Sequence, residues 1–218
     1  MHFRAIVAAV PLALLMAFLS FLLPIMPAAA VPVECLSNGD FAAGYGPDGL
    51  PVGWGRFHQG KGASARWTAD FFPLDPGQTP GRPLLILSLL GRQGGMEPPR
   101  LGLRQTVQVV PGQAYRLSLQ GTLRCAADGP LPSGCGYFPQ WALVAGGESR
   151  PPREEAWHTV PLIPTGPGTW RVEHAQTLIP REPLVTLFVA LAQVESPVAE
   201  WAGLALERIS LVGPGAGE

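Results

Sequence analysis

Apolar and polar residues alternate along several segments of the chain. Residues 103–110 (LRQTVQVV) and 114–123 (AYRLSLQGTL) alternate at every second position, and polar residues separate Tyr115, Leu117 and Leu119 in the second segment. A period of two is typical of a β-strand that buries one face, because successive side chains point to opposite faces of a sheet. We therefore predict two strands here, with these three side chains in the core.

Other segments of similar length carry the same alternation or a continuous apolar run. They cover residues 54–59, 63–68, 84–91, 140–146, 156–163, 169–179, 184–194 and 201–212. The 27 Gly and 25 Pro residues end strands and form turns, and no stretch keeps a helical period beyond two turns. About ten strands without helices predict a single all-β domain, a jelly-roll β-sandwich of two antiparallel sheets.

The first thirty residues are expected to lie outside this domain. An apolar run covers residues 5–26, and Pro27-Ala28-Ala29-Ala30 follows it. An apolar run that ends in small residues of the A-x-A type is typical of a signal peptide. We predict a signal peptide over residues 1–30 and a mature domain over 31–218; the alternative is an uncleaved anchor, since the run is long enough to span a bilayer.

Composition and charge narrow the choice of partner. Of 218 residues, 47% are hydrophobic and 14% charged, which is enough apolar surface for a core in a domain of this length. The formal net charge is −1 and basic residues do not cluster. Nucleic acid is therefore not an expected partner.

Three cysteines leave one unpaired if a disulfide forms. Cys125 and Cys135 bracket the short segment AADGPLPSG, and a bridge between them would close a small ring that stabilises the fold by about 2–3 kcal/mol. We predict this disulfide and a free, buried Cys35. A bridge from Cys35 to either of the others is the open alternative.

Five motifs follow one another in a recognisable order. They are LSNGDF (36–41), LPVGW (50–54), LRQTVQVVPGQAYRLSL (103–119), TWRVEHAQTLIP (169–180) and LALERISLV (204–212). In this order the sequence resembles the CenC-like carbohydrate-binding modules, jelly-roll sandwiches of the galactose-binding-like superfamily. The resemblance covers about Cys35 to Val212. It implies that Asn38-Gly39 turns the chain into the fold and that Phe41 and Trp54 fill the core.

The sequence departs from that family at the positions that hold a structural calcium ion. Family members carry an acidic residue directly after the Phe, where this chain has Ala42, and an acidic pair in the last strand, where it has only Glu207. Calcium requires six or more oxygen ligands. Asp40 and Glu207 are the remaining candidates, and we expect no bound cofactor.

A sugar-binding site needs an aromatic platform with polar side chains beside it. Trp54 and Trp170 match structural positions of the family, so Trp67 and Trp141 are the preferred platform, with Trp157-His158 third. The polar neighbours come from the segment before Trp67, if the two early strands form a hairpin, and from the residues around Trp141. The candidate ligand-binding residues are Trp67, Trp141, Tyr137, Arg56, His58 and Gln140.

The chain lacks the sequence motifs of common hydrolases, among them G-x-S-x-G and H-E-x-x-H. We therefore expect an exported, non-catalytic module that binds a polysaccharide or cell-surface glycan, secreted or held at the extracytoplasmic surface. Membrane contact is expected only through the N-terminal segment, if it is not cleaved. The alternative is a structural or protein-interaction β-sandwich of the cell envelope, which the apolar segments 84–90 and 184–194 favour.

Overall fold

The structure is a computed structural model that describes residues 31–59, 65–70, 84–90, 100–126, 133–194 and 201–215. For 65–70, 84–90, 126, 133–134 and 201 only the backbone is described. The predicted signal segment, residues 1–30, lies outside the described residues. Within the described part no helix is long and apolar enough to cross a membrane.

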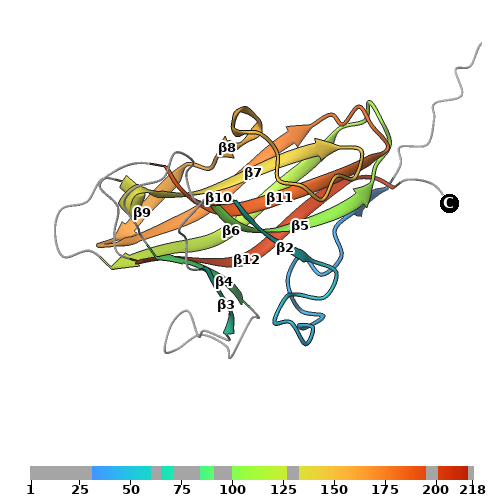
Figure 1. Cartoon of the computed structure of the whole chain (residues 1–218). Helices are drawn as coiled ribbons and strands as arrows, with labels where there is room; N and C mark the ends of the chain where they lie inside the picture. Colours follow the sequence, from blue (N-terminus) through green and yellow to red (C-terminus); the bar gives the residue numbers. More distant parts are fainter. Residues whose placement is uncertain are drawn as a thin grey trace, which may run out of the picture. The chain divides into compact units, whose positions relative to one another are not determined.

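The described strands form two antiparallel sheets (Figure 1). In hydrogen-bonded order, the larger sheet contains β3 (Ala65–Asp70), β4 (Leu84–Leu90), β12 (Trp201–Pro214), β6 (Tyr115–Ala126), β10 (Thr169–Leu178) and β9 (Leu162–Gly166), and β1 (Pro32–Glu34) also pairs with β12. The smaller sheet contains β2 (Gly55–Gln59), β5 (Arg100–Gln108), β11 (Leu184–Gln193), β7 (Tyr137–Ala145) and β8 (His158–Thr159). Two short 3-10 turns, η1 (Ser133–Gly136) and η2 (Glu154–Ala156), lie between strands.

The predicted all-β sandwich is confirmed. Tyr115, Leu117 and Leu119 of β6 are buried in the core, and the intervening Arg116 and Gln120 are exposed. The core lies between the sheets, where β5, β11 and β7 of the smaller sheet contribute alternate apolar side chains. Burying this apolar surface, at about 25 cal/mol per Å², is the main force that holds the sheets together.

Two details of the predicted strands are wrong. Residues 156–163 do not form one strand: they divide among the end of η2, β8 and the start of β9. β8 pairs with β7 in the smaller sheet and β9 pairs with β10 in the larger one, so the chain passes from one sheet to the other between them. The strand β1 was not predicted, because it has three residues, all exposed, and so shows no apolar pattern.

The opening motif folds as the family resemblance implied. Asn38 has φ 51°, and its side chain donates to the carbonyl oxygens of Gly44 (3.1 Å) and Val52 (3.2 Å), which closes the loop on itself. Phe41 and Trp54 are buried with ring centroids 6.5 Å apart. The loop therefore seals one part of the core.

The predicted disulfide joins Cys125, near the end of β6, to Cys135 of η1. Cys35 is free and half-buried. Burial, and secondarily the charge of Glu34, raises the pKa of the Cys35 thiol, so the protonated form is favoured at neutral pH.

Candidate functional site

The outer face of the smaller sheet carries an apolar cluster that is separate from the core. Its buried members are Phe57, Ala142, Trp157, Phe188 and Ala190. Phe188 lies between Leu187 and Val189 on β11, and because those two neighbours face the core, Phe188 points away from it. An outer sheet face is ordinarily solvated, so a buried aromatic cluster there is a feature to explain.

Trp157 covers this face from the segment that follows η2. Its ring stacks on Phe57, with centroids 5.7 Å apart and an interplanar angle of 26°, and meets Phe188 edge-on at 6.3 Å. Gly102 of β5 makes room for the Phe57 ring, because a Cβ at Gly102 would stand 2.5 Å from a ring carbon. The cluster is thus built from three aromatic rings over a glycine.

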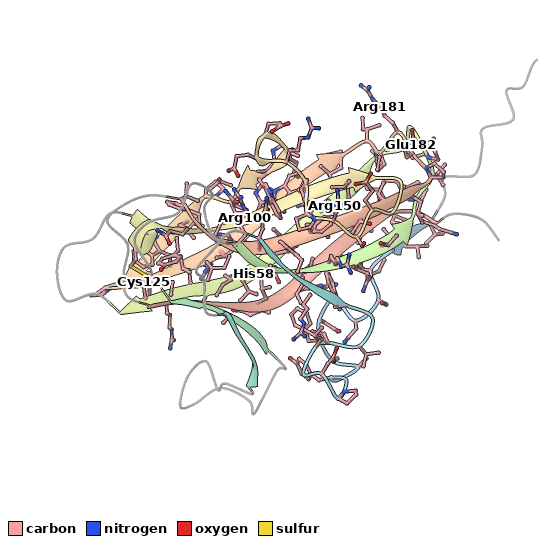
Figure 2. All side chains as sticks on the ribbon, viewed as in Figure 1. His58, Arg100, Cys125, Arg150, Arg181 and Glu182 are labelled. Atoms are coloured by element: carbon pink, nitrogen blue, oxygen red, sulfur yellow. A yellow bond between two sulfur atoms is a disulfide. The ribbon has the colours of Figure 1, made fainter. Side chains whose placement is uncertain are left out.

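Arg100 lies against the same rings, at the start of β5 (Figure 2). Its side chain is 1% exposed, and its guanidinium carbon lies 5.2 Å from the centroid of the Trp157 ring. The Nε atom donates to Gln140 Oε1 at 2.7 Å, and Nη2 pairs with the carboxylate of Glu154. Gln140 donates in turn to the Thr159 hydroxyl at 3.1 Å. The guanidinium is therefore held in one orientation by β7 and η2.

Three buried polar atoms at this place have no hydrogen-bond partner: Arg100 Nη1, Trp157 Nε1 and Gln59 Oε1. Gln59 is the Cα partner of Arg100 across β2 and β5, so both side chains lie on one face. Among the described residues only Gln193 adds another such atom. An unpaired buried polar group costs about 1–3 kcal/mol, so three in one place make this surface the candidate site.

We call this surface the polar–aromatic face. It consists of Phe57, Gln59, Arg100, Gln140, Glu154, Trp157 and Phe188. It combines apolar ring faces with two unpaired donors and one unpaired acceptor. Such a combination suits a ligand that has both C–H faces and hydroxyl or carboxyl oxygens.

Of the predicted site residues whose side chains the structure describes, only Gln140 lies on this face. Trp141 and Tyr137, on the same strand, are 2% and 0% exposed and point into the core, so the expected open platform at Trp141 is absent. The physical reason is the strand period: neighbours of Gln140 face the other side of the sheet. Burial also raises the pKa of the Tyr137 phenol to about 12. Ligand contact by Trp141 and Tyr137 stays a prediction without a surface to support it.

Trp141 is instead held by two histidines. His158 stacks on its ring with centroids 4.3 Å apart, and the Trp141 Nε1 donates to His174 Nε2 at 3.2 Å. Burial lowers the pKa of His174; a hydrogen bond with Gln176 acts in the opposite direction, and the charge of His158 lowers it further. His174 is therefore a neutral acceptor that ties β10 to β7 across the two sheets.

The two early strands do not form the hairpin that would have placed Arg56 and His58 beside Trp67. β2 pairs with β5 in the smaller sheet, whereas β3 pairs with β4 in the larger one. Arg56 and His58 are exposed, and they flank Phe57 on β2, so they face away from the polar–aromatic face. Trp67 belongs to β3, where its side chain lies outside the described residues.

A polar pocket of about 390 Å³ lies over the outer face of the larger sheet. Its polar lining is Gln120, Thr122, Thr165, Arg171, Glu173 and Glu207. The calcium candidate Glu207 belongs to this pocket, whereas Asp40 accepts a hydrogen bond from the N–H of Ala42 at 3.2 Å. Within the described ranges no group of three or more His, Cys, Asp or Glu side chains has a geometry that could hold a metal ion. The lining contains no aromatic ring, so it fits a sugar less well than the polar–aromatic face does.

Arg100 and Trp157 were not among the preferred site residues, although β5 contains a usable signal. Leu101 and Leu103 alternate with Arg100, Gly102 and Arg104, which places two cations and a glycine together on the face opposite the core. The partner residues come from β2, β7 and η2, and no local pattern links those segments to β5.

No protein-family model matches the chain, and no curated protein matches it. The solved structures that match the chain include carbohydrate-binding modules, enzyme domains and adhesin domains. The xylan-binding domain CBM22-1 of Paenibacillus barcinonensis Xyn10C is 14% identical (TM-score 0.43), over 87% of this chain and 100% of that one. TmCBM61, solved with β-1,4-galactotriose, is 12% identical (TM-score 0.41), over 82% of this chain and 97% of that one.

The enzymatically active domain of tailspike protein 4 from bacteriophage CBA120 is 13% identical (TM-score 0.45), over 82% of this chain. The chain spans only 21% of that protein's length. The sequence identity to each of these three structures is 14% or less.

Proposed function

We propose that the protein is a non-catalytic carbohydrate-binding protein that recognises a polysaccharide or cell-surface glycan on the polar–aromatic face. The observation that carries the proposal is the group of unpaired atoms on Gln59, Arg100 and Trp157 beside stacked aromatic rings. Pyranose rings offer C–H faces to an indole and hydroxyls to planar side chains, so a sugar supplies both kinds of partner at once.

The covering segment determines how a glycan reaches this face. Trp157 is 9% exposed, and it belongs to a loop that meets the sheet at η2 and β8 rather than to a central strand. A glycan reaches Gln59 and Arg100 when this segment shifts outward and Trp157 exchanges its contact with Phe57 for one with a sugar ring. Movements of surface loops such as this one occur on the nanosecond to microsecond timescale. They do not require the two sheets to separate.

Export is part of the proposal. The disulfide between Cys125 and Cys135 persists in oxidising compartments outside the cytosol, where polysaccharides and surface glycans are met. A bound structural calcium is not part of the proposal, and Asp40 and Glu207 are not assigned to the glycan site. Another envelope protein is not required as a partner.

The test is an affinity-gel and pull-down panel of plant, fungal and bacterial glycans, with the protein purified after export of the full chain. We expect retention by at least one glycan, loss of that retention in Trp157→Ala and Gln59→Ala, and no loss in Gln120→Ala. Gln120 is an exposed glutamine in the pocket of the other sheet and is the matched control. Release of reducing ends during incubation would contradict the non-catalytic assignment.

A second function, a protein-interaction sandwich of the cell envelope, is favoured by two observations. The preferred platform ring, Trp141, is buried, and Trp157 covers the aromatic face in the free protein. Failure of every glycan in the panel to retain a folded protein would select this second function over the first.

A further inference from the structure

We propose, building on the function proposed above, that the glycan is acidic: its uronic-acid carboxylate binds Arg100, and Glu154 occupies that carboxylate's place in the free protein. The inference concerns the chemical class of the ligand, which the aromatic rings alone do not determine. It rests on the charge, burial and pairing of Arg100 and Glu154.

Arg100 carries a permanent positive charge at a buried position, where desolvation of a charge costs free energy. Its side chain is 1% exposed, its Nε donates to a neutral amide oxygen of Gln140, and Nη1 has no partner. A buried guanidinium requires a counter-charge, because desolvation costs more than neutral hydrogen bonds return. A neutral sugar would leave this requirement to Glu154 alone.

The counter-charge of the buried Arg100 is the carboxylate of Glu154, which lies at the protein surface. The side chain of Glu154 is 62% exposed and belongs to a three-residue 3-10 turn, so the pair joins a buried cation to a solvent-facing anion. A ligand carboxylate that replaces Glu154 leaves the net charge around Arg100 unchanged, while Glu154 returns to water at little cost. Exchanging the Glu154 carboxylate for a ligand carboxylate therefore changes the electrostatic free energy of the protein little. The contacts of the sugar ring then add to the binding free energy.

The remaining unpaired atoms match the groups that surround a uronate carboxyl. Arg100 Nη1 and Trp157 Nε1 are donors to carboxylate or ring oxygens, and Gln59 Oε1 is an acceptor for a hydroxyl. The guanidinium lies over the Trp157 ring at 5.2 Å, so a carboxylate at Arg100 sits next to an aromatic surface for the sugar itself. Arginine binds carboxylates through two parallel N–H groups, and here the Nη1 group of Arg100 has no partner.

A second cation lies along the same face. Arg104 is four residues after Arg100 on β5, so both side chains are on one side of the strand, and Phe188 is its Cα partner on β11. Its Nη1 donates to the carbonyl oxygen of Ser149, a neutral group. A polymer with repeated carboxylates can thus meet two arginines along one strand.

The test compares matched acidic and neutral polymers. Sodium polygalacturonate and sodium alginate are used beside their carboxyl-reduced neutral counterparts, with dextran sulfate as a polyanion that has no carboxylate. We expect at least one uronate polymer to bind about tenfold or more tightly than its reduced form, which corresponds to the loss of a charge-assisted hydrogen-bonded pair. Dextran sulfate is expected to bind more weakly than the preferred uronate.

The variant that decides the role of Glu154 is Glu154→Gln, with Glu155→Gln as the matched control. Glu155 is the exposed neighbour on the same turn, so both variants change the charge of the segment equally. Removing the competing carboxylate is expected to tighten uronate binding about two- to fivefold, the range of an exposed ion pair, and Glu155→Gln is expected to leave it unchanged. Because Glu154→Gln also removes the counter-charge of the buried Arg100 in the free protein, the urea midpoint of both variants is measured first, and binding is compared under conditions in which both are folded.

The outcomes separate this inference from the function on which it rests. Equal binding of acidic and reduced polymers, with loss in Trp157→Ala, would overturn the acidic-glycan inference and leave the glycan-binding function intact. Stronger binding of dextran sulfate than of any uronate would overturn it as well, as would a Glu154→Gln variant that binds uronate more weakly. No retention by any polymer would instead remove the function itself.

Discussion

Trp141 and Trp157 are both buried, yet only one of them has its polar group satisfied. The indole N–H of Trp141 donates to His174 Nε2 at 3.2 Å, and His158 stacks on its ring. The indole N–H of Trp157 has no partner, and the ring lies on Phe57 outside the core. The difference teaches that two equally buried tryptophans can differ in hydrogen-bond satisfaction, and this difference is the reason to assign Trp141 to the core and to propose Trp157 for the site.

The largest expected contrast is in stability after truncation. Trp141→Ala is expected to lower the free energy of unfolding by about 3–5 kcal/mol, because it leaves a cavity between the sheets. Trp157→Ala is expected to cost about 1–2 kcal/mol, because its segment can close over the gap from the surface. Urea denaturation followed by intrinsic fluorescence measures both values, and equal losses would contradict the distinction.

A finer contrast removes only the indole N–H. Trp141→Phe leaves His174 Nε2 without its donor and is expected to cost about 1–2 kcal/mol. Trp157→Phe removes a donor that was already unpaired, and we expect a change within about 0.5 kcal/mol. The comparison uses the same denaturation assay, and a larger loss at Trp157 would show that its N–H has a partner in solution.

The Trp141 region should also respond to pH, whereas the Trp157 region should not. Burial lowers the pKa of His174 in the folded protein, so the unfolded chain binds the proton more readily. Stability is then complete above the unfolded value of about 6.5 and is lost as the pH falls from there toward the lowered folded pKa. The urea midpoint is expected to decrease as the pH is lowered from 7 to 5.

The control for this pH effect is His174→Asn, which cannot take up a proton. The variant is expected to be less stable at pH 7 but to lose less of its remaining stability on acidification than the wild type does. Identical pH profiles in the two proteins would assign the acid sensitivity to another group.

The smallest expected effect concerns the stacked histidine. His158 is exposed and its ring covers Trp141 at 4.3 Å, so His158→Ala is expected to cost about 0.5–1 kcal/mol. Fluorescence emission of the variant would shift to longer wavelength if water then reaches the Trp141 ring. An unchanged spectrum and unchanged stability would mean that β8 keeps the ring covered without this side chain.

The sequence predicted the strands well where the pattern was local. The alternation in 114–123 placed Tyr115, Leu117 and Leu119 in the core correctly, since the strand period decides which face each side chain occupies. The alternation of apolar and polar residues does not show which strands pair with each other. β2 and β3 are neighbours in the sequence but belong to different sheets, because partners distant in the chain, β5 and β4, hold them.

The site was harder to predict than the fold for the same reason. The sequence contains six tryptophans, and the preference for Trp141 over Trp157 rested on its neighbours Tyr137 and Gln140 alone. What separates them is His174, which lies 33 positions from Trp141 on the other sheet, and the absence of such a partner at Trp157. Arg100 required the combination of β2, β7 and η2, which only the folded chain brings together.

The pairing of the first described strand with the last constrains the order in which the chain can fold. Pro32 lies opposite Pro214, and β12 also separates β4 from β6 within the larger sheet. This sheet therefore cannot assemble until the residues of β12 have been synthesised and are free to pair. The complete larger sheet therefore depends on the last described strand of the chain.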